Sequence, residues 1–102
     1  MSTASSTDYI VIASATAKPG MQVELEQALL EVAAPTRAQP GCRAFHLLRP
    51  SGDPATIVGF ERWASRADHE NHMRGAHFQR LAQRMGGLLC APPTVTAYQE
   101  IG

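Results

Sequence analysis

The chain has 102 residues, the size of a single domain, and a domain this small buries only a modest core by itself. Its hydrophobic fraction of 44% and charged fraction of 18% are typical of a soluble globular protein. No apolar run approaches the roughly 18 residues that a membrane span needs. The formal net charge is zero and the nine basic side chains are dispersed, so nucleic acid and anionic membrane surfaces are poor partners.

Residues 1–8 are polar and small, with neither the basic flank nor the apolar segment of a secretory signal. We expect a short disordered leader at 1–8, a single domain at 9–102 and a cytoplasmic protein. Cys42 and Cys90 lie far apart without a second ligand nearby, which indicates free thiols and not a zinc site or a disulfide scaffold.

The first half of the domain predicts a strand followed by a helix. Residues 9–17 are apolar and rich in β-formers, and they end at a Lys-Pro-Gly turn. Leu25, Ala28, Leu29 and Val32 then follow at helical spacing, opposite glutamates. Pro35 should kink or end this helix, since proline lacks the amide donor, and the Pro-Gly pair at 40–41 terminates the segment.

The second half predicts two strands, a helical region and a last strand. Residues 42–49 and 56–63 are joined by a short connection rich in turn formers, which favours an antiparallel hairpin. Ser65, with Asp68 three residues on, resembles a capping box and begins a helical region that extends to about Met85. Residues 94–101 supply the fourth strand.

The order β-α-β-β-α-β predicts an α+β, ferredoxin-like fold, with an antiparallel sheet covered by helices on one face. The first three strands carry apolar residues at both odd and even positions, that is, on both faces of the sheet. In a sheet with one face in water, apolar and polar residues alternate more regularly along each strand. We therefore expect a second copy to cover the other face, giving a homodimer with a barrel-like interior between the two sheets.

The stretch 61–78 concentrates three histidines, a tryptophan and a carboxylate. On one helix, His69 and His72 share the stripe that faces the core. His77 lies about 140° from His72 and joins it only if the helix breaks at Gly75. The spacing is not that of a metal-binding motif, so no metal site is predicted.

Gly59, Glu61 and Trp63 alternate on the third strand and share one face. Together with His72 they could line a cavity, because imidazole exchanges protons near neutral pH and Gly59 leaves room on that face. The plainer interpretations are core packing for Trp63, pairing with an arginine for Glu61, and partial exposure or an internal hydrogen bond for His69. Strand 42–49 leaves open whether its Phe45 face or its His46 face lines the cavity.

In the order and spacing of its short motifs the chain resembles the antibiotic biosynthesis monooxygenase family of small dimeric α/β-barrel proteins. The motifs are "AKPG", "RAQPGCRAFHLLR", "FERWASRADHENHM", "AHF" and "APPTVTAY". The resemblance covers almost all of the chain from Tyr9 to Ile101.

The resemblance implies oxygenation of an electron-rich aromatic, a hydroquinone or polyketide phenol, by dioxygen without a flavin, a metal or another cofactor. It implies a catalytic group made of His72 as base or hydrogen-bond partner, Trp63 as wall and donor, and Glu61 as the residue that orients. The expected substrate-binding residues are His69, His77, Phe45, His46 and Ser14. The haem-degrading branch carries other residues where this chain has Ser14, His72 and Leu81, so haem degradation is not implied.

Two other classes of function stay open at this point. A non-catalytic dimer that binds a small apolar metabolite fits the same fold, because function depends on the site. An isomerase or aldehyde-processing enzyme of a small metabolite would also use histidines in a pocket.

Overall fold

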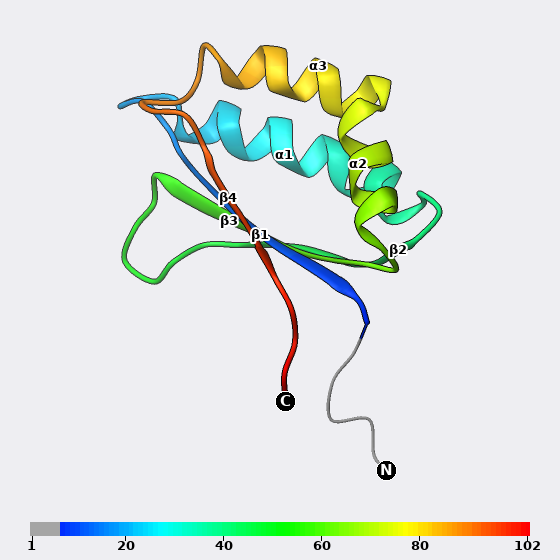
Figure 1. The fold of residues 1–102 in the computed structure, drawn as a ribbon. Coiled ribbons are helices and arrows are strands. Elements are labelled where there is room, and N and C mark those ends of the chain that lie inside the picture. Colours follow the sequence, from blue (N-terminus) through cyan, green and yellow to red (C-terminus); the bar gives the residue numbers. More distant parts are fainter. Residues whose placement is uncertain (1–6) are drawn as a thin grey trace.

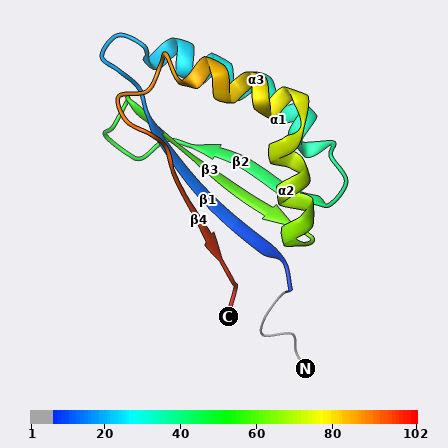
Figure 2. The ribbon, with the colours of Figure 1, turned by 45° about the horizontal axis from the view of Figure 1, so that its top comes forward.

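The computed structural model describes residues 7–102, which form a four-stranded antiparallel sheet covered on one face by three helices (Figure 1). The elements in chain order are β1 (Tyr9–Thr16), α1 (Gln22–Arg37), β2 (Cys42–Leu48), β3 (Thr56–Trp63), α2 (Arg66–Arg74), α3 (Ala76–Met85) and β4 (Thr94–Tyr98). The strand order β2-β3-β1-β4 is that of the expected ferredoxin-like fold, which is confirmed (Figure 2).

The pairing of the central strands determines which of their residues lie beneath the helices. β1 pairs with β3 along its whole length, from Tyr9 opposite Trp63 to Thr16 opposite Thr56. β2 and β3 form the expected antiparallel hairpin, with an irregularity between Cys42 and Ala44. Because alternate residues point to opposite faces, the register places the inner faces of β1 and β3 together beneath the helices.

Helix α1 covers the sheet with the apolar stripe that its spacing predicted, and Leu25 and Ala28 are completely buried. Of the two expected effects of Pro35, a kink or the end of the helix, the second is wrong, because the helix continues two residues further, to Arg37. The missing N–H of Pro35 removes one helical hydrogen bond, the one to the carbonyl four residues earlier, and leaves the bonds of the last turn intact. The N–H groups of Ala38 and Gln39 still close this turn onto Ala34 O and Thr36 O, both at 3.1 Å.

The second helical region is two helices instead of one. Ser65 caps α2 by accepting a hydrogen bond from the N–H of Asp68 at 3.2 Å, as the sequence predicted. At Gly75 the backbone turns extended, with ψ of 153°, so this residue ends α2 and begins α3. The break at Gly75 changes the direction of the chain before His77.

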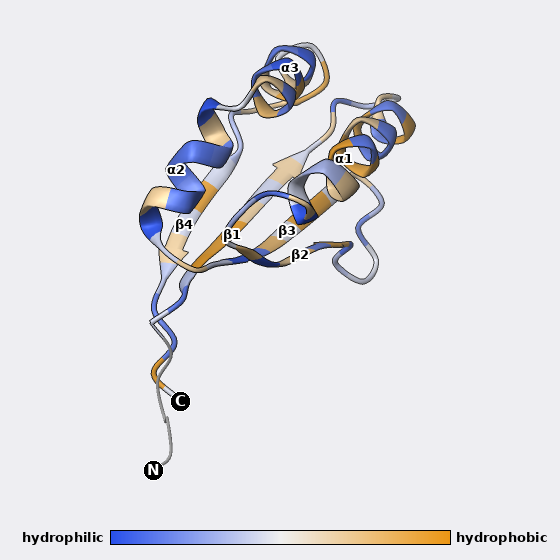
Figure 3. Ribbon diagram, turned by 90° about the vertical axis from the view of Figure 1, so that its right-hand side faces the viewer, coloured by the Kyte–Doolittle hydropathy of each residue, from blue (hydrophilic) through white to orange (hydrophobic). Residues whose placement is uncertain are grey.

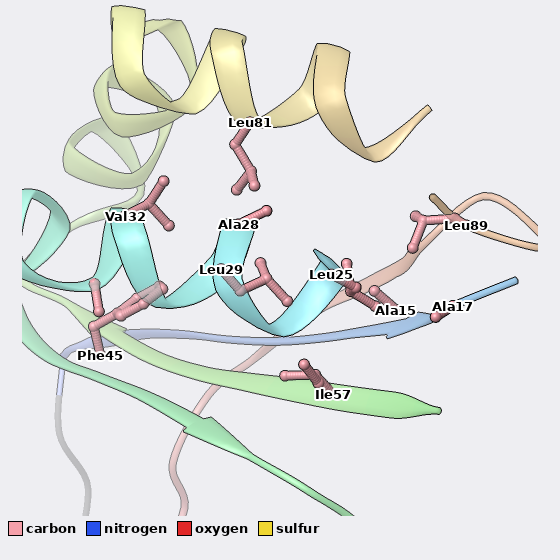
Figure 4. Packing of buried hydrophobic residues seen from close by; sticks show 11 residues of the cluster. Ala15, Ala17, Leu25, Ala28, Leu29, Val32, Phe45, Ile57, Leu81 and Leu89 are labelled. Atoms are coloured by element: carbon pink, nitrogen blue, oxygen red, sulfur yellow. The ribbon is translucent and has the colours of Figure 1, made fainter. Parts of the chain in front are cut away.

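The hydrophobic core lies between α1, α3 and the inner face of the sheet (Figure 4). Leu81 reaches from α3 towards α1, while Phe45 and Ile57 rise from the strands below. Full burial of such side chains stabilises the fold by about 1.5–3 kcal/mol each. The core thus fixes the distance between the helices and the sheet.

The three helices all lie on one side of the sheet, and no described part of the chain covers the other side (Figure 3). Strand residues on that outer face include Ile12, Phe60, Leu48 and Tyr98, of which the last two are 52% and 48% exposed. The second apolar face that the sequence indicated is therefore present.

The ends of the domain differ slightly from expectation. Residues 1–6 of the expected leader lie outside the described residues, but Asp8 forms ion pairs with Arg43 at 3.1 Å and Arg62 at 3.4 Å. β4 ends at Tyr98, which lies opposite Ile10, and does not extend to 101, because β1 offers only one further residue to pair with. Among the described residues no helix has the length and apolar character to cross a membrane.

Candidate functional site

A cavity of about 100 Å³ lies between the inner face of the sheet and the helices. It is of the same order as apolar cavities of about 150 Å³ that bind a single aromatic ring. Among the described residues that line it, the polar side chains on the inner face are Glu61 and His72. Ser14 is also a lining residue, but it alternates with Ala13 and Ala15 on β1, so its side chain lies on the outer face of the sheet. A ligand here would be surrounded by hydrocarbon and would meet very few polar groups.

Glu61 enters the cavity wall from β3 and is only 8% exposed. Its Oε1 accepts a hydrogen bond from the indole N–H of Trp63 at 2.9 Å, since residues two apart on a strand share a face. Burial raises the pKa of Glu61 above its usual range, and the hydrogen bond from Trp63 opposes this in part. The carboxyl group of Glu61 therefore keeps its proton to a higher pH than an exposed glutamic acid does.

Gly59 leaves the space beside Glu61 open. A Cβ built on Gly59 would lie 4.0 Å from Glu61 Oε2 and 3.9 Å from Leu47 Cδ2. Oε2 therefore faces the volume above Gly59, while Oε1 is held by Trp63. This agrees with the room that the sequence analysis assigned to this glycine.

His72 enters the opposite wall from α2 and is 4% exposed. Its ring packs 5.0 Å from Trp63 and 5.1 Å from Phe78, measured between ring centroids. Its Nδ1 lies 2.6 Å from Oε1 of Gln39. Burial, followed by the nearby His77 and His69, lowers the pKa of His72 to about 4, so the imidazole is neutral at pH 7.

His69 and His77 lie beside Glu61 and His72, outside the described lining of the cavity. His69 is buried, with Nε2 at 3.9 Å from Glu61 Oε1, and burial lowers the pKa of His69. The break at Gly75 brings His77 within 5.6 Å of His72 between ring centroids, and its Nε2 lies 3.4 Å from the hydroxyl of Thr36. His69 therefore packs beside Glu61, and His77 beside His72, without lining the cavity.

Strand β2 presents its Phe45 face to the cavity, which answers the question that the sequence left open. Phe45 is buried and lines the cavity. Ser14 reaches the cavity with its backbone only, because its side chain lies on the outer face of β1, so the expected contact from its hydroxyl is not supported by its position. His46 does not line the cavity, because it is the alternate residue of β2: it is exposed on the outer face, with its ring 6.5 Å from that of Phe60. The expectation that His46 contacts a ligand in this cavity is not supported by its position.

Trp63 also differs from expectation. It is completely buried, and its only ring donor is used by Glu61. Its indole N–H is therefore directed to the Glu61 carboxyl group and not into the cavity.

Two polar residues near His72 were missed by sequence reasoning. Thr36 continues the buried stripe of α1 and could have been found by extending that periodicity. Gln39 follows the helix, where no periodic pattern applies. Among residues 7–102, no group of three or more His, Cys, Asp or Glu side chains is arranged to hold a metal ion.

Comparison with known proteins gives consistent matches. A family model described as "Antibiotic biosynthesis monooxygenase" matches residues 8–84. A protein of Mycobacterium tuberculosis named "Putative monooxygenase Rv0793" is 35% identical over 86 residues, which is 84% of each chain.

Solved structures agree with these matches. The crystal structure of PA3566 from Pseudomonas aeruginosa superimposes with a TM-score of 0.89 at 30% identity, covering 95% of this chain and 97% of the other. The structure of Rv0793 superimposes with a TM-score of 0.84 at 33% identity, covering 89% and 92%.

Proposed function

Because the chain belongs to the antibiotic biosynthesis monooxygenase family, we propose that it oxidises a small electron-rich aromatic, a hydroquinone or polyketide phenol, with dioxygen and without a cofactor. The observation that carries this proposal is one apolar cavity faced by Glu61, whose pKa is raised, and His72, whose pKa is lowered. Ionisable groups in a cavity whose pKa values are displaced by burial are typical of acid–base sites.

The reaction is balanced by the substrate itself. One oxygen atom of dioxygen enters the ring and the other leaves as water, and the aromatic substrate supplies all the electrons that reduce dioxygen. The protein therefore has to favour the deprotonated, more easily oxidised form of the substrate. That task is one of proton transfer and electrostatic stabilisation.

His72 is the proton acceptor in this proposal. Neutral imidazole at pH 7 can accept the proton of a phenolic hydroxyl, whereas an imidazolium could not. The apolar walls exclude water and so strengthen the interaction between His72 and the bound hydroxyl.

Glu61 is the partner on the opposite wall. In its protonated form, which burial favours, Oε2 can carry the proton into the space above Gly59 and donate a hydrogen bond to an oxygen anion there. Trp63 holds the other carboxyl oxygen in place. Phe45 supplies an apolar contact to the bound ring.

The proposal includes a homodimer formed through the outer face of the sheet. That face carries apolar residues such as Ile12, Phe60 and Leu48 among threonines and is uncovered by the described chain, and a domain of this size gains from a partner. A second copy offers the same apolar face by symmetry, so the two sheets would enclose the barrel-like interior.

The test is oxygen uptake by metal-stripped protein offered hydroquinones, naphthols and anthrones, with His72→Ala as control. Uptake should exceed autoxidation for at least one class and fall roughly 100-fold or more in the variant. No uptake across the panel would favour a non-catalytic binding dimer or an isomerase. A flavin or haem band in the absorbance spectrum of the active protein would contradict the cofactor-free part.

A further inference from the structure

We infer that Gln39 fixes the tautomer of His72, so that Nε2 faces the cavity as a hydrogen-bond acceptor and the site selects ligands with a free hydroxyl over their methyl ethers. This inference rests on the proposed function in that it concerns the same cavity. Gln39 is a positioning residue, because it contacts His72 and is absent from the described cavity lining.

The backbone holds Gln39 firmly after α1. Its N–H donates to Thr36 O and its carbonyl accepts from the N–H of Cys42, both at 3.1 Å. The second contact closes a four-residue turn in which proline is followed by Gly41 with φ of +82°, the combination of a type II turn. The Pro-Gly pair that ends the helical segment therefore also places the amide of Gln39.

The orientation of the Gln39 amide follows from its surroundings. A Cβ on Gly75 would lie 3.6 Å from Gln39 Nε2, 3.2 Å from His72 O and 3.8 Å from Asn71 O. The amide nitrogen thus lies on the side of the carbonyls that end α2, where an N–H group is favoured over an oxygen. Oε1 is left to face His72 Nδ1 at 2.6 Å, and an amide oxygen only accepts, so Nδ1 carries the proton.

The consequence falls on the other ring nitrogen. A neutral imidazole with its proton on Nδ1 has an unprotonated Nε2. In the described part of the chain the imidazole of His72 makes no hydrogen bond besides that to Gln39, and no fully buried polar side-chain atom there lacks a partner. Nε2 is therefore accessible, and the space that His72 lines is the cavity.

An acceptor in an apolar cavity discriminates between ligands. A phenolic hydroxyl can donate to Nε2, whereas the methyl ether of the same ring offers no proton and leaves the nitrogen without a partner. We expect 1-naphthol to bind at least about 10-fold more tightly than 1-methoxynaphthalene.

Nitrogen-15 NMR of the histidine rings at pH 7, without ligand, reads the tautomer directly. The wild type should show a protonated Nδ1 and an unprotonated Nε2 at His72, assigned by the signals lost in His72→Asn. Gln39→Glu, which keeps an acceptor beside Nδ1, should keep that nitrogen protonated. Gln39→Leu should give a mixture of tautomers, and Gln83→Leu, at an exposed glutamine of α3, should change nothing. A proton on Nε2 in the wild type, or an unchanged Gln39→Leu spectrum, would overturn the inference.

Anaerobic calorimetric titration with the two naphthalene probes tests the selectivity. The preference for 1-naphthol should hold in the wild type and Gln83→Leu and shrink in Gln39→Leu. Equal binding of the two probes, or binding of neither, would overturn the selectivity. If tautomer and preference hold but no aromatic is oxygenated, the proposed function fails while this inference stands.

Discussion

Glu61 and His72 face the same cavity, yet burial moves their pKa values in opposite directions. A buried carboxylate is penalised as an anion, so the pKa of Glu61 rises. A buried imidazolium is penalised as a cation, so the pKa of His72 falls to about 4. One apolar environment therefore makes the acid a better proton holder and leaves the histidine free to accept a proton.

Replacement of Glu61 by Gln should stabilise the protein at pH 7. The pKa of Glu61 is higher in the folded state than its ordinary value of 4.5, so its ionisation costs stability as pH rises above that value. Gln keeps an acceptor for Trp63 and never ionises. Thermal unfolding should show a gain of roughly 0.5–2 kcal/mol at pH 7 that disappears at pH 4, together with loss of activity. A gain that is equal at both pH values would show that ionisation is not the cause.

The pH dependence of the reaction should reflect the low pKa of His72. Since the folded pKa is about 4, the imidazole remains neutral throughout pH 6 to 8 and protonates only in more acid solution. In the Glu61→Gln background, residual kcat/KM should be level between pH 6 and 8 and fall towards pH 4. A midpoint near 6.5, the ordinary value for histidine, would contradict the burial of a neutral His72.

The elements that build the site were predictable to different degrees. Alternation on β3 correctly placed Gly59, Glu61 and Trp63 on one face, because the side-chain period of a strand depends on the backbone alone. The break at Gly75 was only a condition in the sequence, since glycine within a helical pattern need not end it. The inward face of β2 could not be chosen, because both of its faces carry apolar residues.

The contact between Gln39 and His72 was not predictable for a related reason. It joins two side chains 33 positions apart, and its distance depends on how α2 lies over the end of α1. The end of α1 falls between the two positions that the sequence offered, Pro35 and the Pro-Gly pair at 40–41, because proline near the end of a helix removes only one hydrogen bond.

The turn before β2 gives a test at the scale of elements. Gly41 has φ of +82°, and a Cβ there would overlap the carboxyl group of Asp68 in the first turn of α2. Gly52 has nearly the same φ, +81°, with nothing within 4 Å of a Cβ. Gly52→Ala should therefore cost about 1–3 kcal/mol from backbone strain alone, and Gly41→Ala clearly more. Equal losses in chemical denaturation would show that the loop and α2 do not pack as described.

At the scale of the whole molecule, the fold and the family are shown. The uncovered outer face of the sheet predicts that the protein forms a dimer. Sedimentation at micromolar concentration should give twice the chain mass of 11.0 kDa. Phe60→Glu, on the outer face, should yield monomers because it buries a charge in the interface. Val23→Glu, at a 64% exposed site on α1, should leave the dimer intact. A wild-type monomer would contradict the proposed interface.

The central claim is that the intact molecule transfers one oxygen atom from dioxygen to an aromatic ring held between Glu61 and His72. The most direct measurement is mass spectrometry of the product formed under ¹⁸O₂ by metal-stripped protein, with a control in H₂¹⁸O for exchange of carbonyl oxygens. One labelled oxygen atom per product, formed by the wild type and almost absent with His72→Ala, is the predicted result. A product without label from ¹⁸O₂, or labelling that is equal in the variant, would contradict the account.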